Sequence, residues 1–575
     1  MSIKIHRAFF WLFVLCLSSA SLHGQSSPFD PQVSAEASLI HEKVDCFTDR
    51  SLYITEEVIR FSARVQTVGL PDNRDWSSIL YVELISADGE REASGKFPVQ
   101  DKLCKGEIAI PGEILTGNYY LRCYTRWMRN RGPKIYSYIP LRIINPHRPE
   151  LSGESAMGNM GELLSPRSEG EGAFEFSGHS GTYNRGDTVS MGINIGGTVN
   201  MAMAEGCLTV VAFEAKPAAP VKIIETQSER PEDFQLSFLP DLYGATLSGS
   251  VLQWNEEANL PLADARIHFT LMGDQSAYFV ASSDVHGKFS VTLPNREGVQ
   301  ELLVQPESMG NERVEVRIDR DFDQRHLPLS FEPFQLSESE ESLLSTMARK
   351  VQLSMIYDMT KGAGENRADS VHVPFYGSPT LSVNMDDYVL LPSLKEVFIS
   401  LVPGVTPVTR NDKDFLFIDS ENPSLNRLFY PLIMIDEVPL FDKTQFMSVP
   451  PEKISRIDVI DDLYLKGNVW FGGIINLHSK QKDIAGIDLP EDAFFFDFQA
   501  MYPASLKEEM TVWKNDRMPD TRNTLLWIPA FQIEKDLQST ISFVAPDYPG
   551  DYVVLFRGVD ELGKLLSLES VISIK

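Results

Sequence analysis

The sequence predicts a mainly β chain of several small β-sandwich modules in tandem, with one small α+β module. Most of the chain consists of short runs in which apolar and polar residues alternate, which is the pattern of antiparallel strands. Gly, Pro, Asn and Asp separate these runs at the spacing of sandwich folds. The chain has 575 residues and 43% apolar content. It is therefore long enough for about three to five domains with sizeable cores.

The first 24 residues have the features of a secretory signal peptide (1–24). Lys4 and Arg7 are followed by the apolar run 8–17, which is shorter than the roughly 20 residues that span a bilayer. We expect cleavage after Gly24. Bulky Leu15 before Cys16 argues against a lipoprotein site. No later segment reaches transmembrane length, so we expect no membrane span after cleavage.

The chain is strongly acidic. Its formal net charge is −28, and loss of Lys4 and Arg7 with the signal makes it −30. This charge argues against nucleic acid and anionic membrane surfaces as partners. A solvated acidic surface is the simplest interpretation, and a basic partner is the alternative.

Alternating runs divide most of the chain into modules. The first module covers 25–146, with strand-like runs at 58–65, 79–85 and 118–124. Residues 147–172 are rich in Gly, Ser, Glu and Pro and are expected to be a linker. Further β modules are expected at 173–228, 240–332 and 490–575.

One clear helix and one α+β module lie between the last two β modules. Ser337 and Glu340 form a capping box that opens a helix over 337–358, followed by a polar connection to residue 380. The α+β module is expected at 381–482. It has a possible short helix at 394–401 and apolar strand candidates at 432–435, 457–460 and 474–477.

Four cysteines remain after cleavage, and none forms a Cys-x-x-Cys pair that would indicate zinc or redox chemistry. They are Cys46, Cys104, Cys123 and Cys207. Cys46 and Cys123 each lie within a strand-like run of the first module. In an exported chain they form either a disulfide or a pair of small buried thiols.

The sequence lacks a convergent set of catalytic or metal-binding residues. Residues 178–181 (Gly-His-Ser-Gly) lack the second glycine of a nucleophile elbow. The alternating Asp319, Asp321 and Asp323 lack the glycine turn and later Glu of a calcium loop, so we expect a charged strand edge or turn. We therefore predict no catalytic residue, no cofactor and no metal, and a protein that is not an enzyme.

An aromatic-rich run from Tyr119 to Met128 is the first candidate interaction surface. Alternate members of this run should face a sandwich core, and exposed members would bind a protein partner or a glycan. The candidates are Tyr119, Tyr120 and Trp127.

Two segments resemble a known exported family. Residues 42–64 and 119–128 resemble the macroglobulin-type, immunoglobulin-like sandwich of large exported proteins of the Bacteroidetes, although Thr55-Glu56 stands where Pro-Gly is usual. Residues 182–187 are similar to the opening of a second such module, and 523–529 with 549–552 to the closing module. The third module is similar to carboxypeptidase-regulatory-like domains, on Gly249, Pro261-Leu262 and Asp284-x-x-Gly287-x-Phe289.

The α+β module resembles the plug of TonB-dependent outer-membrane receptors. The matching segments are 431–440, 451–460 and 472–477, with Glu437 in place of a common glycine. Asp436 and Glu437 in this match are further candidate interaction residues. A receptor barrel of about 22 strands needs roughly 300 residues, whereas 93 follow the module here. The resemblance therefore implies a plug-like module that acts on another chain.

Together these observations predict an exported protein, periplasmic or associated with the outer membrane of a Gram-negative bacterium. We expect a non-catalytic scaffold or adaptor that binds an outer-membrane or surface protein, and a barrel in another chain is one candidate partner. A surface protein that binds glycans or peptides for nutrient uptake is the alternative, and an enzyme ranks last because no nucleophile, base and metal set converges.

Overall fold

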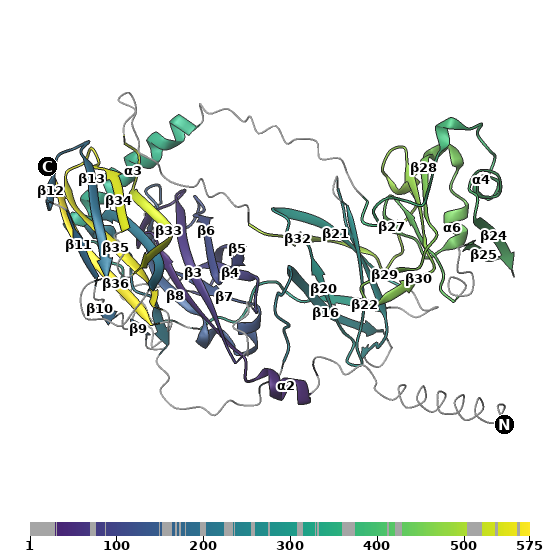
Figure 1. Ribbon diagram of the computed structural model, residues 1–575, viewed down its shortest axis with the longest axis horizontal. Coiled ribbons are helices and arrows are strands. Elements are labelled where there is room, and N and C mark those ends of the chain that lie inside the picture. Colours follow the sequence, from purple (N-terminus) through teal and green to yellow (C-terminus); the bar gives the residue numbers. More distant parts are fainter. Residues whose placement is uncertain are drawn as a thin grey trace, which may run out of the picture.

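In the computed structural model the chain forms four units arranged along one long axis (Figure 1). We name them the composite sandwich, the first sandwich, the middle sandwich and the α+β module, in their order along that axis. The described residues are 29, 31–69, 76–86, 88–148, 150–151, 164–166, 170–171, 174–178, 180–195, 203–223, 234, 236–254, 259–273, 276–307, 314–327, 329, 333–358, 374–410, 413–419, 428–502, 520–534, 539–560 and 564–575. The predicted signal peptide and most of the connection 359–380 lie outside them.

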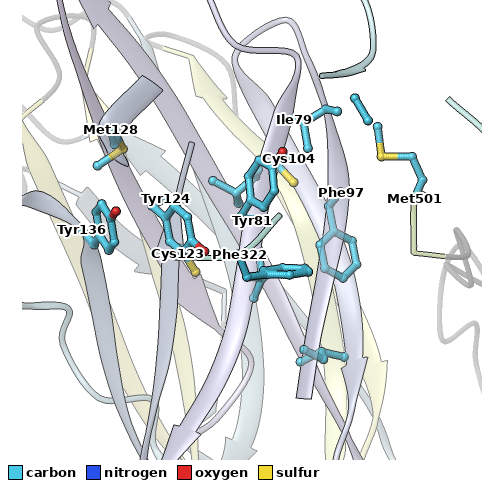
Figure 2. Close-up of a cluster of buried hydrophobic side chains, with 14 of the residues drawn as sticks. Ile79, Tyr81, Phe97, Cys104, Cys123, Tyr124, Met128, Tyr136, Phe322 and Met501 are labelled. Atoms are coloured by element: carbon cyan, nitrogen blue, oxygen red, sulfur yellow. The ribbon is translucent and has the colours of Figure 1, made fainter. Parts of the chain in front are cut away.

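The first sandwich is built from consecutive antiparallel strands, as the alternating pattern predicts. β5 pairs with β6 on one side and β4 on the other, so one path of strands folds over to enclose a core. Figure 2 shows part of that core, including Tyr81, Phe97 and Tyr124. The elements are α2 (Pro31–Ala37), β1 (His41–Thr48), β2 (Leu52–Ile54), β3 (Val58–Val68), β4 (Ile79–Ser86), β5 (Arg91–Gln100), β6 (Leu103–Ala109), β7 (Gly117–Tyr124), η1 (Trp127–Asn130), η2 (Pro133–Ile135) and β8 (Ser137–Ile144).

Most strands of the expected modules 173–228 and 490–575 form one sandwich, which corrects the division made from the sequence. β14 pairs with β33 on one edge and β35 on the other, and β13 pairs with β34. The strands are β10 (Gly170–Glu171), β11 (Phe174–Ser177), β12 (Thr182–Tyr183), β13 (Thr188–Ile195), β14 (Met203–Ala212), β33 (Thr524–Glu534), β34 (Ser539–Val544), β35 (Gly550–Asp560) and β36 (Leu565–Ile574), with η3 (Phe213–Ala215) after β14.

The linker predicted at 147–172 contributes short strands. β9 (Leu164–Pro166) and β15 (Val221–Ile223) extend the β8 edge of the first sandwich, and β10 pairs in parallel with β36. Segments without apolar alternation therefore add strands to these sheets, because the exposed edge of a sheet offers backbone hydrogen bonds to any extended chain.

The middle sandwich also closes with a distant strand. Its second sheet has the order β19-β18-β21-β32, so residues 494–499 belong with the module predicted at 240–332. The strands are β16 (Ala245–Gln253), β17 (Leu260–Pro261), β18 (Arg266–Leu271), β19 (Ala277–Ser282), β20 (Lys288–Leu293), β21 (Val299–Pro306), β22 (Val314–Ile318) and β32 (Phe494–Gln499).

Helix α3 (Glu338–Asp358) begins where the capping box predicts. The Ser337 amide donates to Glu340 Oε2 at 2.8 Å, and the Glu340 amide donates back to Ser337 Oγ at 3.3 Å. Leu344, Met347 and Val351 pack against β2 of the first sandwich. The helix therefore covers that end of the molecule rather than linking the middle sandwich directly to the α+β module.

The α+β module has one mixed sheet, in the order β23-β28-β31-β26-β27, covered by short helices. The helix predicted at 394–401 is present as α4, and Ser393 caps it. The elements are β23 (Leu381–Asn384), η4 (Met385–Asp387), α4 (Leu394–Leu401), β24 (Val405–Arg410), β25 (Lys413–Ile418), β26 (Leu432–Ile435), β27 (Val438–Pro439), α6 (Lys443–Met447), η5 (Pro451–Lys453), β28 (Ile454–Ile460), β29 (Tyr464–Lys466), β30 (Val469–Phe471), β31 (Ile474–Ser479) and η6 (Ile484–Gly486).

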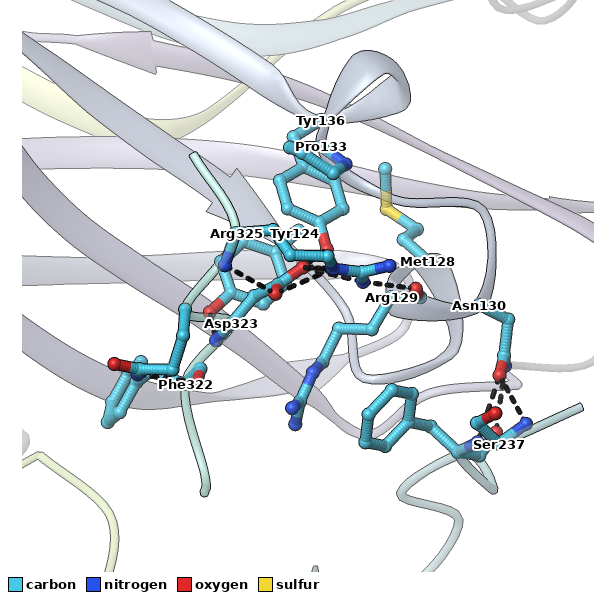
Figure 3. A network of polar contacts seen from close by, with 12 residues as sticks. Tyr124, Met128, Arg129, Asn130, Pro133, Tyr136, Ser237, Phe322, Asp323 and Arg325 are labelled. Atoms are coloured by element: carbon cyan, nitrogen blue, oxygen red, sulfur yellow. Dashed lines mark hydrogen bonds and ion pairs between the residues drawn. The ribbon is translucent and has the colours of Figure 1, made fainter. Parts of the chain in front are cut away.

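Buried charges join the first and middle sandwiches. Arg122 donates to Glu83 and to the backbone oxygens of Asp323 and Arg325, and Arg129 donates to the backbone oxygens of Asp321 and Arg320. Figure 3 shows Asp323 between Tyr136 and Arg325, with which it makes hydrogen bonds. The alternating aspartates are therefore part of a junction between two units, because their segment supplies acceptors to arginines of the first sandwich.

Lys96 joins the same two units from β5. Its ammonium donates to Asp321 Oδ2 at 2.8 Å and to the Gln499 carbonyl at 2.6 Å, and lies over the Phe498 ring. The side chain is fully buried, and burial lowers its pKa from the ordinary value. A buried ammonium is tolerated only with such partners.

Gly206→Ala tests whether the composite sandwich is one unit. A Cβ at Gly206 would lie 1.9 Å from the Arg557 carbonyl oxygen on β35, so the two strands must separate. We expect a loss of about 3 kcal/mol in the free energy of unfolding, measured with denaturant. In Gly178→Ala the Cβ meets nothing within 4 Å. This control should lose only about 1 kcal/mol, for the positive φ. Proteolysis of Gly206→Ala that spares residues 524–575 would contradict a shared sandwich.

Glu42→Gln tests a buried carboxyl in β1. Glu42 Oε2 accepts hydrogen bonds from Ser77 and Thr125, yet burial dominates and raises its pKa from 4.5 to about 7. The unfolded chain loses this proton near pH 4.5 and the folded chain only near pH 7, so stability falls as pH rises between these values. The fall should be on the order of 3 kcal/mol and absent in Glu42→Gln. Parallel stability–pH curves for the two proteins would contradict the assignment.

Candidate binding site

The aromatic run of the first sandwich is core, which corrects its prediction as an interaction surface. Tyr119, Tyr120 and Trp127 are all buried. The Trp127 indole packs edge-on against Trp76 and donates to the Ile40 carbonyl at 3.1 Å. The side chains face inward on both sides of β7, because the strand has its own sandwich core on one face and the neighbouring unit on the other.

Asp436 and Glu437 form the turn between β26 and β27, and neither is a free surface group. Both have positive φ, 51° and 66°. Asp436 accepts hydrogen bonds from the Ser479 amide and hydroxyl and from the Ile484 amide. The Glu437 side chain is buried and its amide donates to Asn476 Oδ1. These residues hold the turn against the end of β31, so the prediction that they form a partner surface does not fit their positions.

Cys46 and Cys123 meet in the core of the first sandwich. Their sulfur atoms are 3.3 Å apart, and both residues are fully buried. All four described cysteines are buried thiols.

A group of aromatic side chains and one leucine, some exposed and some half-buried, lies on the α+β module instead. We call it the aromatic face, and it consists of Phe415, Phe417, Leu428, Phe429, Tyr430 and Trp470. Tyr430 contacts the rings of Phe415 and Phe417 at centroid distances of 6.2 and 6.5 Å, and Phe429 contacts Trp470 at 6.4 Å. Leu428, Tyr430 and Trp470 are 71%, 57% and 47% exposed. Such a concentration of exposed apolar groups is typical of an interaction surface.

Two hairpins present the aromatic face. On β25, Leu416 and Ile418 are buried, so the alternation of the strand directs Phe415 and Phe417 to the opposite side. Lys443, at the start of α6, lies over the Tyr430 ring at 4.2 Å and the Phe415 ring at 5.2 Å. Burial lowers the pKa of Lys443 from its ordinary value. The ammonium therefore fixes these two rings while their outer edges stay in contact with solvent.

The aromatic face continues into a groove of about 860 Å³ against the middle sandwich. Phe429 and Trp470 line one wall. The other wall carries charged groups of the middle sandwich, namely Asp264, Arg266, Asp284 and Lys288. An aromatic wall that faces charged groups suits a ligand with both apolar and polar parts.

A tight turn sets the width of this groove. Gly467, between β29 and β30, has φ of 58°, and a Cβ there would lie 2.4 Å from the Val280 carbonyl oxygen. The next residue, Asn468, accepts a hydrogen bond from Ser282 at 3.3 Å. The hairpin that carries Trp470 therefore touches β19 directly, which only glycine at position 467 allows.

A polar cluster under the sheet stabilises the module from within. Asp458 Oδ2 accepts hydrogen bonds from Tyr376, Arg456 and His478, at 2.9, 2.9 and 2.7 Å, and its Oδ1 accepts one from Ser382 at 2.7 Å. Burial raises the pKa of Asp458, but the hydrogen bonds from His478 and Ser382 outweigh it and hold the pKa at about 2. Tyr376 also packs in an apolar cluster with Tyr278 of the middle sandwich, so this cluster supports the contact between the two units.

The aromatic face was missed from the sequence because its members come from three separate segments. Phe415 and Phe417 lie on one strand, 428–430 precede another, and Trp470 lies in a hairpin. One signal was present: the run Leu428-Phe429-Tyr430 is apolar directly before the buried strand β26, where a turn is normally polar.

The described residues hold neither a cluster of metal-binding side chains nor a helix that could span a membrane. No group of three or more His, Cys, Asp or Glu side chains there is arranged to hold a metal ion. Among the same residues, no helix has the length and apolar character needed to cross a membrane.

Asp458→Asn should destabilise the α+β module by about 2 kcal/mol, because an amide cannot accept all four hydrogen bonds. Asp462→Asn, at an exposed aspartate just beyond the same strand, is the matched control. The low pKa of Asp458 gives stability that is present above pH 3.8 and lost as pH falls toward 2. The gap between wild type and variant in thermal unfolding should therefore close over that interval. A gap that persists at pH 2 would contradict this role.

Solved structures that match this chain include bacterial alpha-2-macroglobulins. No family model matches the chain, and no curated protein matches it. The native conformation of Escherichia coli alpha-2-macroglobulin is 10% identical with a TM-score of 0.23, and covers 93% of this chain and 40% of its own. Salmonella alpha-2-macroglobulin reacted with methylamine is 9% identical with a TM-score of 0.22, and the match covers 93% and 39%.

A repeat from the extending region of a large adhesion protein is also similar, with 9% identity, a TM-score of 0.14, and coverage of 49% of this chain and 74% of its own. This chain spans about two fifths of the length of the macroglobulins that it matches. The mainly β fold of tandem sandwiches itself rests on the strand pairing described above.

Proposed function

We propose that this protein is a non-catalytic adaptor of a bacterial cell envelope, which binds another envelope protein through the aromatic face of its α+β module. The observation that carries the proposal is the exposure of Leu428, Tyr430 and Trp470, of which Tyr430 contacts Phe415 and Phe417 while Trp470 contacts Phe429. Aromatic side chains dominate the binding energy of protein interfaces, because each buries a large apolar area at low cost in conformational entropy. The predicted export signal and the plug-like resemblance of the same module favour an envelope partner.

The arrangement of the units supports this role. The α+β module lies at one end of the long axis and the composite sandwich at the other (Figure 1). The buried junction at Lys96 and Arg122 holds the intervening sandwiches together. A row of sandwiches with a binding module at one end is suited to reach a partner at a distance, and it needs no bond chemistry.

The groove beside the aromatic face favours the second candidate, a glycan or peptide ligand. Trp470 can stack on a sugar ring, and Asp264 and Asp284 on the facing wall supply acceptors for hydroxyl groups. A protein partner is the stronger candidate because Leu428 and Tyr430 extend the apolar surface beyond this groove, where a bound sugar would leave them in water.

The test is photo-crosslinking in intact cells from position 428, an exposed position of the aromatic face, followed by identification of the captured chain. We expect one specific envelope protein, and Tyr430→Ala with Trp470→Ala should reduce its recovery at least about tenfold. The matched control is Tyr243→Ala with Trp254→Ala, an exposed tyrosine and tryptophan of the middle sandwich.

Equal loss in the two double variants, or capture of no specific chain, would overturn the adaptor role. A glycan array run with the purified protein separates the alternatives. Binding there that Trp470→Ala abolishes would replace the protein partner with a carbohydrate.

A further inference from the structure

Two cysteines from opposite sheets of the first sandwich meet in its core. Cys46 lies on β1, where it pairs with Ala63 of β3, and Cys123 lies on β7, where it pairs with Val82 of β4. Their sulfur atoms are 3.3 Å apart, while a disulfide bond is about 2.05 Å long. A small rotation about each side chain closes this gap, so the backbone of the two strands already has the separation that the bond needs.

Neither of the other two cysteines competes with Cys123 for Cys46. Cys104 on β6 and Cys46 on β1 both pair with Ala63 of β3, from its two sides. Two strands of one sheet separated by a third lie roughly 9.5 Å apart, beyond the reach of a disulfide. Cys207 lies in the composite sandwich, in a cluster with Phe47 and Trp527.

We propose that Cys46 and Cys123 form a disulfide that fastens the two sheets of the first sandwich in the exported protein. The two thiols lose two electrons and two protons and form one S–S bond. The oxidant is the disulfide form of a thiol–disulfide oxidoreductase of an oxidising compartment, which takes up the electrons and protons and becomes a dithiol.

The bond must form before the core closes. Both thiols are fully buried, and burial raises the pKa of Cys46 well above its ordinary value, with the neighbouring Cys123 adding to this shift. A buried thiol with little thiolate reacts slowly, so an oxidant reaches the pair only while the sandwich is still open. Once formed, the bond is equally protected from reductants. It closes a loop between residues 77 positions apart, which restricts the unfolded chain.

The test is a disulfide map of the full-length protein isolated from the cell envelope. Free thiols are alkylated in denaturant and the chain is digested with trypsin without reductant. We expect peptide 44–50, which carries Cys46, to be linked to peptide 123–126, which carries Cys123. Peptide 103–105 should carry alkylated Cys104. Recovery of Cys46 and Cys123 mainly as alkylated thiols would overturn the proposal.

A matched pair of double variants gives a second readout. Cys46→Ala with Cys123→Ala should lower Tm by on the order of 10 °C more than Cys104→Ala with Cys207→Ala, because each pair removes two buried sulfurs but only the first removes the bond. Equal shifts in Tm would count against the bond. If the first double variant fails to fold, the disulfide map of the wild type still decides. Neither readout depends on the aromatic face, so failure here leaves the proposed adaptor role standing.

Discussion

The architecture depends on one constraint, which is that both edges of β14 must find hydrogen-bonding partners. β14 lies in the first half of the chain, and its partners β33 and β35 lie more than 300 residues later. Buried backbone amides and carbonyls left without partners are costly, so the composite sandwich cannot close until the end of the chain returns. Gly206 and Gly558 mark how closely these strands approach, since a Cβ at either would meet the opposite backbone.

The remaining units follow from this return of the chain. The middle sandwich likewise takes its last strand, β32, from beyond the α+β module. The α+β module is therefore inserted between two strands of the middle sandwich, and the middle sandwich is inserted between two halves of the composite sandwich. An inserted unit is held by two chain connections as well as by its contacts. Lys96 is central to these contacts, because its ammonium binds both the segment that leaves β22 and the strand β32 that returns.

The aromatic residues of the first sandwich are buried, whereas several of those on the α+β module are exposed, because the two sets lie at different places in the row of units. Tyr119 and Tyr120 on β7 and Trp127 on η1 are covered because their segment lies between two packed units, and Arg122 and Arg129 of the same segment reach the next unit. The aromatic face lies on the last unit of the row, and Leu428, Tyr430 and Trp470 are exposed among the described residues. Aromatic content alone therefore does not distinguish a core segment from a surface segment in this protein. The place of the segment in the row of units does distinguish them.

The sequence alone determined the local elements. Period-two alternation marked the strands, the capping box at Ser337 and Glu340 marked the start of α3, and the apolar spacing of 394–401 marked α4. Local hydrogen bonds and side-chain periodicity decide such features, and both are written in neighbouring residues. Only the tertiary structure decided that strands of two predicted modules form one sandwich, that the segment of the alternating aspartates contacts the first sandwich and that Trp470 joins Phe429. These facts depend on pairing between distant segments, and strands with the same alternation have no local signal for which partner they take.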